Sequence, residues 1–341
     1  MSRTTQGSAF GLGTALIWGA MFVIAKSALG RVDPFHLTAI RYLVASLVLL
    51  AALWAVEGAQ ALRFDGQGLR LAGLGVLGFA GFNLLAFTGL AHAPAQGAAL
   101  ITALAPLLTA LVLWLGRGVR PSRTTLVLLL VALFGVALVI THGDPGSLAT
   151  GWGDGLVLAG VLCFIVYTIA ASRFPGFSPL RFTALTAGLG WFAIAGATLV
   201  ATLAGLEPEP SAADVGAVAP QIAYIALLGA VVAVVAWNAA AGLIGPQNTA
   251  LFGNLIPITT FGIEIARGYR PFALEFVGAG ITVAALLATN LFQRRAQSSS
   301  FSTKTSISPP QGRPTAQPSS SEMPYESSWG SPVSSTLRAH S

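Results

Sequence analysis

Residues 94–121 read PAQGAALITALAPLLTALVLWLGRGVRP, and residues 246–271 read PQNTALFGNLIPITTFGIEIARGYRP. Each stretch opens with a proline and an amide residue, carries a second proline inside an apolar helix (Pro106, Pro257), and ends in Arg-Gly-x-Arg-Pro. The two copies lie about 150 residues apart. A repeat of this length in an apolar chain predicts two homologous membrane halves, and in transporters the substrate site commonly lies where such halves meet.

The composition places the chain in a membrane. Hydrophobic residues make up 54% of it, charged residues 9%, and the mean hydropathy is +0.75. A soluble domain is far less apolar and far more charged, so we expect a polytopic membrane protein. The net charge of +6 comes from basic residues scattered through loops rather than gathered in a stripe, which argues against nucleic-acid binding. The single Cys163 lies in an apolar run and is interpreted as a small buried hydrophobe.

Apolar runs of about 20 residues, the length that a helix needs to cross the hydrocarbon, recur along the chain. They are bounded by charge, glycine or proline. Ten spans are predicted: 8–29, 36–56, 70–91, 95–115, 123–141, 154–172, 180–204, 216–240, 247–266 and 272–292. The fold class expected is therefore an all-α integral membrane protein with ten transmembrane helices.

The arginines of the connections predict the orientation. With the N-terminus inside, the outer connections hold only Arg31, Arg267 and Arg270. The inner ones hold ten: Arg3, Arg63, Arg70, Arg117, Arg120, Arg123, Arg173, Arg181, Arg294 and Arg295. This excess places both termini in the cytoplasm.

The repeat extends beyond its signature. At a constant offset of 145, the aligned pairs are Trp18 with Cys163, Phe22 with Tyr167, and Asp33-Pro34 with Ser178-Pro179. Each half then holds five spans, and an odd number inverts the second half relative to the first. We expect one repeat in 1–142, a second in 150–292, and a disordered cytoplasmic tail in 293–341, which is rich in Ser, Pro and Thr.

These residues also carry a resemblance to a known family. Their order along the two halves resembles the EamA-type repeats of the drug/metabolite transporter superfamily. The residues concerned are Trp18-Gly19, Phe22 and Lys26, then Arg41-Tyr42, Gly153-Asp154 with Tyr167, and the two mid-helix prolines. The resemblance covers roughly residues 8–292. It implies a bundle of ten helices in inverted five-helix repeats, a central cavity, export of amino acids or other small metabolites, and the inner membrane of a bacterium.

Amide and aromatic side chains at membrane depth form the predicted substrate site. In a bilayer, polar side chains turn toward neighbouring helices or a wet cavity, so each of these residues has either a helix-joining or a ligand-binding role. Flat tryptophan rings offer apolar walls for a ligand. The predicted substrate-binding residues are Trp18, Lys26, Arg41, Asn83, Gln96, Tyr167, Trp237, Asn238 and Asn254.

Three ionisable residues in the spans have two interpretations each. Lys26 and Arg41 either anchor their helices at an interface or meet a substrate carboxylate in the cavity. Glu264 is interpreted as the only acid well inside a span; it either carries a coupled proton or lies near the interface, paired with Arg267.

Pro106 and Pro257 are predicted to kink their helices. Each frees a carbonyl one turn earlier, near Thr102 and Gly253. Freed backbone groups are tolerated in a membrane only where protein or water satisfies them, so matching kinks in both halves point toward a cavity.

The sequence contains no pattern typical of hydrolytic, nucleotide or metal chemistry. The four histidines are dispersed, and HExxH, GxSxG and Walker-type loops are absent. We therefore expect no enzyme, no cofactor and no metal. The expected partners are a small-molecule substrate and membrane lipids; the oligomeric state is open, and a monomer is compatible with two fused halves.

The function expected is secondary transport by alternating access, exporting small metabolites, above all amino acids or related carboxylate-bearing compounds. Two alternatives remain. One is a proton-driven multidrug exporter of cationic amphiphiles, with Glu264 as its acid. The other is a membrane scaffold that transports nothing and works through its tail.

Overall fold

The computed structural model describes residues 2–118, 120–141, 151–172, 174, 176–285, 287–288 and 292. All of them lie within one compact unit, Met1–Arg295. The tail predicted for 293–341 lies outside the described residues. Within the described part the chain is all helical, without strands, as the sequence predicted.

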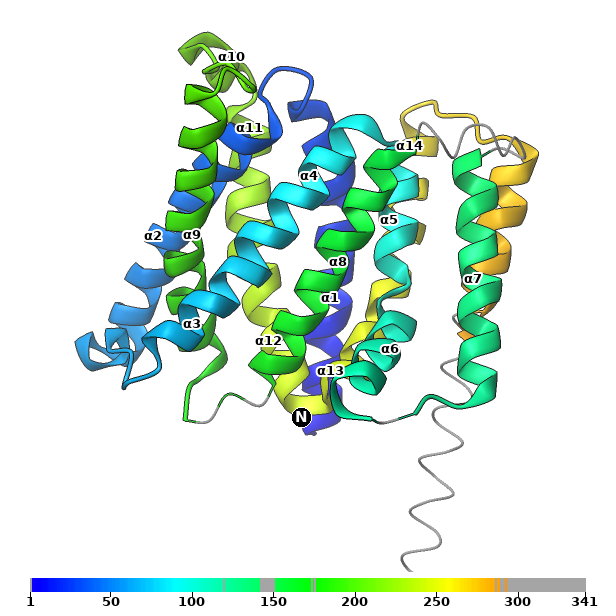
Figure 1. The fold of residues 1–341 in the computed structure, drawn as a ribbon, viewed down its shortest axis with the longest axis horizontal. Coiled ribbons are helices and arrows are strands. Elements are labelled where there is room, and N and C mark those ends of the chain that lie inside the picture. Colours follow the sequence, from blue (N-terminus) through cyan, green and yellow to red (C-terminus); the bar gives the residue numbers. More distant parts are fainter. Residues whose placement is uncertain are drawn as a thin grey trace, which may run out of the picture. The chain divides into compact units, whose positions relative to one another are not determined.

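The helices follow one another as in Figure 1. The first half contains α1 (Arg3–Ala28), α2 (Pro34–Glu57), η1 (Ala59–Leu62), α3 (Gly68–Gly75), η2 (Val76–Gly81), α4 (Phe82–His92), α5 (Ala95–Ala103), α6 (Ala105–Arg117) and α7 (Arg123–Thr141). The second half contains α8 (Trp152–Ala171), α9 (Pro179–Leu203), α10 (Ala212–Ala217), α11 (Ala219–Ala223), η4 (Tyr224–Val232), α12 (Ala233–Ile244), α13 (Pro246–Ala250), η5 (Leu251–Asn254) and α14 (Leu255–Ala266). A last helix covers Ala273–Ala285.

Seven described helices are long and apolar enough to cross a membrane. An eighth candidate is the pair Gly97–Ala103 and Ala105–Gly116, bent by 48°. Two shorter apolar helices, Arg123–Val139 and Ala273–Ala285, fall below the length of a span. Each of the ten predicted ranges thus contains a helix, but the count of ten spans stays a prediction, because only seven helices meet the length and apolarity on which it was based.

Helix ends repeat between the halves. Asp33 accepts hydrogen bonds from the backbone N–H groups of Phe35 and His36, Ser178 accepts one from that of Arg181, and proline occupies the first turn of both helices. A short polar N-cap followed by proline starts a helix without leaving backbone donors unpaired. The glycines of the two Arg-Gly-x-Arg-Pro motifs have φ angles of 68° at Gly118 and 98° at Gly268. Glycine adopts this left-handed conformation readily, so both motifs end helices.

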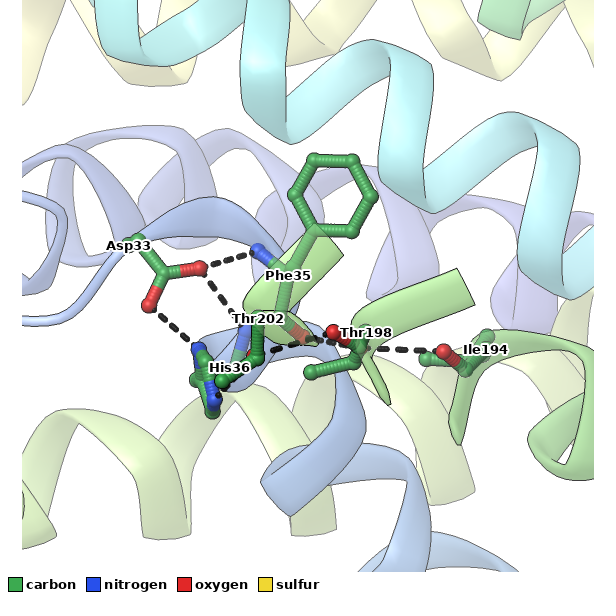
Figure 2. Close-up of polar contacts among 6 residues, drawn as sticks. All are labelled: Asp33, Phe35, His36, Ile194, Thr198 and Thr202. Carbon is green, nitrogen blue, oxygen red and sulfur yellow. Dashed lines mark hydrogen bonds and ion pairs between the residues drawn. The ribbon is translucent and has the colours of Figure 1, made fainter. Parts of the chain in front are cut away.

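Helices α2 and α9, the second long helix of each half, run antiparallel. Figure 2 shows the beginning of α2 against the end of α9. There the Thr198 hydroxyl donates to the Phe35 carbonyl oxygen (3.2 Å), and the Thr202 hydroxyl lies 3.3 Å from Nε2 of His36. The other ring nitrogen of His36 lies 2.7 Å from the Asp33 carboxylate.

The opposite ends of the two helices are also fastened. Arg181, at the start of α9, donates to the carbonyl oxygens of Ala61 (2.8 Å) and Arg63 (2.6 Å) and to the Asp65 carboxylate (2.6 Å). The Ser178 hydroxyl donates to Glu57 at 2.5 Å. Contacts at both ends therefore fix the antiparallel alignment of the pair.

Glycines bring helices of the two halves together. A Cβ at Gly89 on α4 would lie 2.3 Å from the carbonyl oxygen of Gly153 on α8. A Cβ at Gly75 on α3 would lie 2.4 Å from the carbonyl oxygen of Thr186 on α9. Small residues allow helix backbones to approach closely in a membrane, where packing rather than a hydrophobic drive holds helices together. The halves thus share one tightly packed core.

Candidate functional site

A cavity lies where helices of both halves meet. Its lining comes from α1, α4, α5, α6, α8, α12, α13, η5 and α14, and none of the described side chains that line it carries a charge. Its volume is about 50 Å³, which is room for a few water molecules and far less than a small-molecule site needs. A substrate can occupy it only after its walls move apart.

Aromatic rings form one wall of this central cavity. The ring centroids of Trp18 and Trp237 lie 5.0 Å apart, and Phe164 meets the edge of Trp18 at 5.4 Å. Phe82 lies 5.0 Å from Phe164. The indole N–H of Trp18 donates to the Gly229 carbonyl oxygen at 3.0 Å, and that of Trp237 to the Thr168 hydroxyl at 3.3 Å. Because both indole N–H groups are paired with protein, the rings offer the cavity mainly their apolar faces.

Irregular helix segments lie at corresponding places in the two halves, and the broken fourth helices line the cavity. The third long helix of each half contains a π-helical segment, η2 or η4. The fourth is broken at Leu104 in the first half, and in the second it changes to a 3-10 turn, η5. Pro106 lies in the first turn of α6 and Pro257 in the first turn of α14. Irregular backbone at membrane depth is tolerated where it is buried in protein or lines a cavity.

The predicted residues Arg41 and Asn83 lie together behind the cavity wall. Arg41 is 1% exposed and Asn83 is fully buried. A guanidinium N–H of Arg41 donates to the Asn83 side-chain oxygen, and the amide nitrogen donates to Tyr42 (3.1 Å) and to the Phe79 carbonyl (2.7 Å). The guanidinium carbon also lies 4.0 Å from the centre of the Phe87 ring. We call Arg41, Tyr42 and Asn83 the first amide cluster.

Met21 separates this cluster from the central cavity. Its sulfur lies 3.9 Å from a guanidinium nitrogen of Arg41, and the same side chain lines the cavity. Methionine is flexible and readily changes rotamer. Arg41 is therefore a buried cation one side chain away from the cavity.

Asn238 and Tyr167, both predicted site residues, form a corresponding cluster in the second half. The Asn238 amide nitrogen donates to the hydroxyls of Tyr167 and Thr183, each at 2.8 Å. Tyr167 and Thr183 are fully buried and Asn238 is 4% exposed. We call these three residues the second amide cluster. Phe79 joins it to the first, because its ring lies 5.3 Å from both Tyr42 and Tyr167.

The remaining predicted residues lie elsewhere. The Lys26 ammonium donates to the carbonyl oxygens of Leu90 (2.7 Å) and Ala91 (3.0 Å), at the end of α4. Asn254 is 6% exposed and lies in η5, and both polar atoms of its side chain are without a partner among the described residues. The side chain of Gln96 lies outside the described part of the structure.

Glu264, predicted as the only acid well inside a span, is not the most buried acid of the described residues. Glu264 is half-buried, two residues before the end of α14, and does not line the central cavity. The buried acids are Asp154 (8% exposed) and Glu275 (2%). Both lie in the first turn of a helix, where the free N–H groups favour a carboxylate; Glu275 accepts from the Phe272 backbone N–H at 3.0 Å.

Phe164 and Thr168 also line the cavity, although they were not predicted as site residues. A signal was present, because Phe164 lies three residues before Tyr167, and Val161, Phe164, Ile165 and Thr168 have the spacing of one helix face. All four line the cavity.

Comparisons with known proteins agree with this architecture. The model of the EamA-like transporter family matches residues 5–141 and again 151–291. The chain is 31% identical to the uncharacterized transporter YrdR of Bacillus subtilis (strain 168), over 82% of this chain and 90% of that protein. It is 29% identical to the uncharacterized transporter YyaM of the same organism, over 81% and 90%. A solved crystal structure has the same fold, with a TM-score of 0.60 at 23% identity, over 86% of this chain and 99% of that one.

Proposed function

Because the chain belongs to the EamA-like transporter family and its domain occurs twice, we propose that this membrane transporter is a secondary carrier working by alternating access, which exports amino acids or related small carboxylate-bearing metabolites. The observation that carries the proposal is the aromatic central cavity, which is lined by the broken fourth helices of both halves. Carriers commonly bind substrate at such a junction of two repeats.

The proposed architecture is ten helices in two inverted repeats. Supporting it, each predicted span contains an apolar helix. The second helices of the halves, α2 and α9, run antiparallel, as inversion requires. The π-helical segments and the broken helices fall at corresponding places in both halves. We place the protein in the inner membrane of a bacterium, on its similarity to this family. The arginine distribution supports an orientation with both termini cytoplasmic.

The proposed substrate contacts follow from the chemistry of the cavity. The faces of Trp18 and Trp237 suit an aromatic or large aliphatic side chain. A rotamer change of Met21 would expose the Arg41 guanidinium, which matches a carboxylate in geometry and charge. The Asn83 amide holds the guanidinium at one end of this path, and Asn238 is proposed as a further polar contact. Lys26, bound to the end of α4, reaches substrate only in a state where that contact opens.

In this proposal uphill export is driven by an ion gradient or by coupled exchange, because the sequence has no nucleotide-binding loop; without such coupling the protein facilitates downhill flow. Glu264 is retained as the proton-coupling candidate. A second candidate function is export of cationic amphiphiles, which the aromatic lining without a lysine or arginine side chain favours, because ring faces attract cations.

The test is efflux of labelled amino acids from loaded cells, with and without the protein, and with an uncoupler. Carrier activity predicts faster loss of large apolar amino acids from cells that contain the protein. Trp237→Ala should abolish the difference, whereas Trp54→Ala, at a side chain that is 61% exposed on the surface of the helix bundle, should preserve it. Unchanged efflux of every amino acid, together with raised resistance to cationic dyes, would replace the amino-acid proposal with the second candidate.

A further inference from the structure

The orientation of the Asn238 amide is fixed by its neighbours. The Thr183 hydroxyl donates its proton to the Pro179 carbonyl oxygen at 2.7 Å, so toward Asn238 it can only accept. The Thr186 hydroxyl donates to the Phe182 carbonyl oxygen at 2.6 Å, which leaves the Tyr167 hydroxyl to donate toward Thr186 and to accept from Asn238. The amide nitrogen must therefore face both hydroxyls, and the amide oxygen faces away from them.

That oxygen, Oδ1 of Asn238, is buried and has no hydrogen-bond partner among the described residues. The two amide clusters differ in this respect. In the first, the Asn83 oxygen accepts from the Arg41 guanidinium. The repeat offset of 145 places Thr186 at the position that corresponds to Arg41. The same offset sets Leu228 against Asn83, so the two asparagines are alike in burial and not in repeat position. Among the described residues, no cation satisfies the oxygen of Asn238 as Arg41 satisfies that of Asn83.

Asn238 also lines a second cavity, which is separate from the central one. This vestibule has a volume of about 370 Å³ and lies at the end of the bundle where α1 begins, with Gln6, Phe10, Ser172 and Phe182 among its lining. It reaches the second amide cluster at Asn238, and the neighbouring Trp237 lines the central cavity. The unpaired oxygen therefore belongs to a residue that lies between the vestibule and the aromatic wall of the central cavity.

We propose that Asn238 Oδ1 accepts a hydrogen bond from an N–H group of the transported compound. This N–H group then satisfies Asn238 as the Arg41 guanidinium satisfies Asn83. The inference rests on the proposed carrier function and narrows its substrates to compounds that bear an ammonium, amide or guanidinium N–H next to an apolar group. The vestibule is the route by which such a group arrives. Binding of this donor pairs a buried acceptor that would otherwise stay unsatisfied.

Two pairs of probes isolate the N–H group at constant charge. One pair is L-phenylalanine and N,N,N-trimethyl-L-phenylalanine; the other is 2-phenylethylamine and its N,N,N-trimethyl derivative. Dissociation constants are measured by titration calorimetry on the purified full chain in lipid nanodiscs. The wild type should prefer the N–H member by about tenfold or more, the strength of a hydrogen bond from a charged donor.

Asn238→Leu should reduce this preference to the part that the size of the methyl groups alone produces. Asn248→Leu is the matched control, because the Asn248 amide donates to the Ile244 carbonyl oxygen one turn earlier. It should leave the preference at the wild-type value. If Asn238→Leu does not fold, Asn238→Asp serves, because it keeps an acceptor and should keep the preference. An unchanged preference in the Leu variant, a lost preference in the Asp variant, or no preference in the wild type for either pair overturns the proposal.

Transport of the same probes into vesicles that contain the protein separates the two levels of inference. If the wild type shows the Asn238-dependent preference but moves no probe, the acceptor role stands and the carrier function fails. If probes cross the membrane and Asn238→Leu keeps the preference, the carrier function stands and the acceptor role fails.

Discussion

Alanine at Gly75 should weaken the contact between α3 and α9, which joins the two halves. The added Cβ would lie 2.4 Å from the Thr186 carbonyl oxygen and 2.9 Å from the Gly190 backbone nitrogen. Ordinary van der Waals contact begins at 3.4 Å, so the helices must separate by about 1 Å (3.4 − 2.4). A radial gap of that size forfeits up to half of the dispersion attraction of the atoms it parts.

The opposing atoms are backbone on both sides and cannot rotate away. We therefore place the overpacking cost near the upper end of the usual range of about 1–3 kcal/mol. Alanine recovers about 1 kcal/mol over glycine through helix propensity. The net loss expected for Gly75→Ala is about 2 kcal/mol in the free energy of unfolding.

Gly73 provides a matched control in the same helix, because a Cβ there meets nothing within 4 Å. Gly73→Ala should leave stability unchanged or raise it by up to about 1 kcal/mol. The assay is thermal denaturation of both purified variants in one detergent, followed by the loss of the monodisperse fraction. Equal melting temperatures for the two variants, or a Gly75→Ala variant as stable as the wild type, would refute the close-contact argument.

Three further predictions concern charged groups. Asn83→Leu leaves the buried Arg41 cation without its amide acceptor and should lower the free energy of unfolding by about 3–5 kcal/mol. Adding Arg41→Met should restore most of this stability in thermal melts. A double variant no more stable than the single one would contradict the coupling. Lys26→Met frees two carbonyls at the end of α4 and should cost about 1.5–3 kcal/mol; wild-type melting would show that the contact contributes nothing. Burial, and then the Asp33 carboxylate, raises the pKa of the Glu207 carboxyl in the folded protein. The protonated carboxyl therefore stabilises the folded state relative to the ionised one. This stabilisation is full below the pKa of Glu207 in the unfolded chain and is lost as pH rises through its pKa in the folded protein. Glu207→Gln should accordingly gain stability relative to the wild type as pH rises from about 4, and parallel pH profiles of the two proteins would exclude this.

The sequence predicted helix positions well because in a membrane every backbone group must be satisfied within its own helix, so length and apolarity almost determine the outcome. The starts and ends of several helices could also be predicted from the sequence. Asp33-Pro34 and Ser178-Pro179 start helices, and Gly118 and Gly268 end them.

The partners of the polar residues could not be predicted in this way. Whether Lys26 faces a substrate or a helix end depends on α4, which is more than 60 residues away in the chain and carries the carbonyl oxygens that Lys26 binds. Arg41 and Asn83 were both named as site residues, but their mutual pairing depends on how α2 meets α4. Thr183, the partner that fixes the Asn238 amide, carried no signal, because a threonine in an apolar helix commonly bonds its own backbone.

The π-helical segments η2 and η4 precede the two asparagines by a few residues. A π turn accommodates one residue more than an α turn. Deleting one residue from η4 and winding the segment as a regular α-helix would therefore leave Asn238 facing the hydroxyls of Tyr167 and Thr183, and the same holds for Asn83 after η2. A deletion in the regular turn between η4 and Asn238 has no such compensation and would turn the Asn238 side chain by about 100°, away from both hydroxyls. Each π segment is thus the place where its helix can lose a residue and still keep its amide cluster.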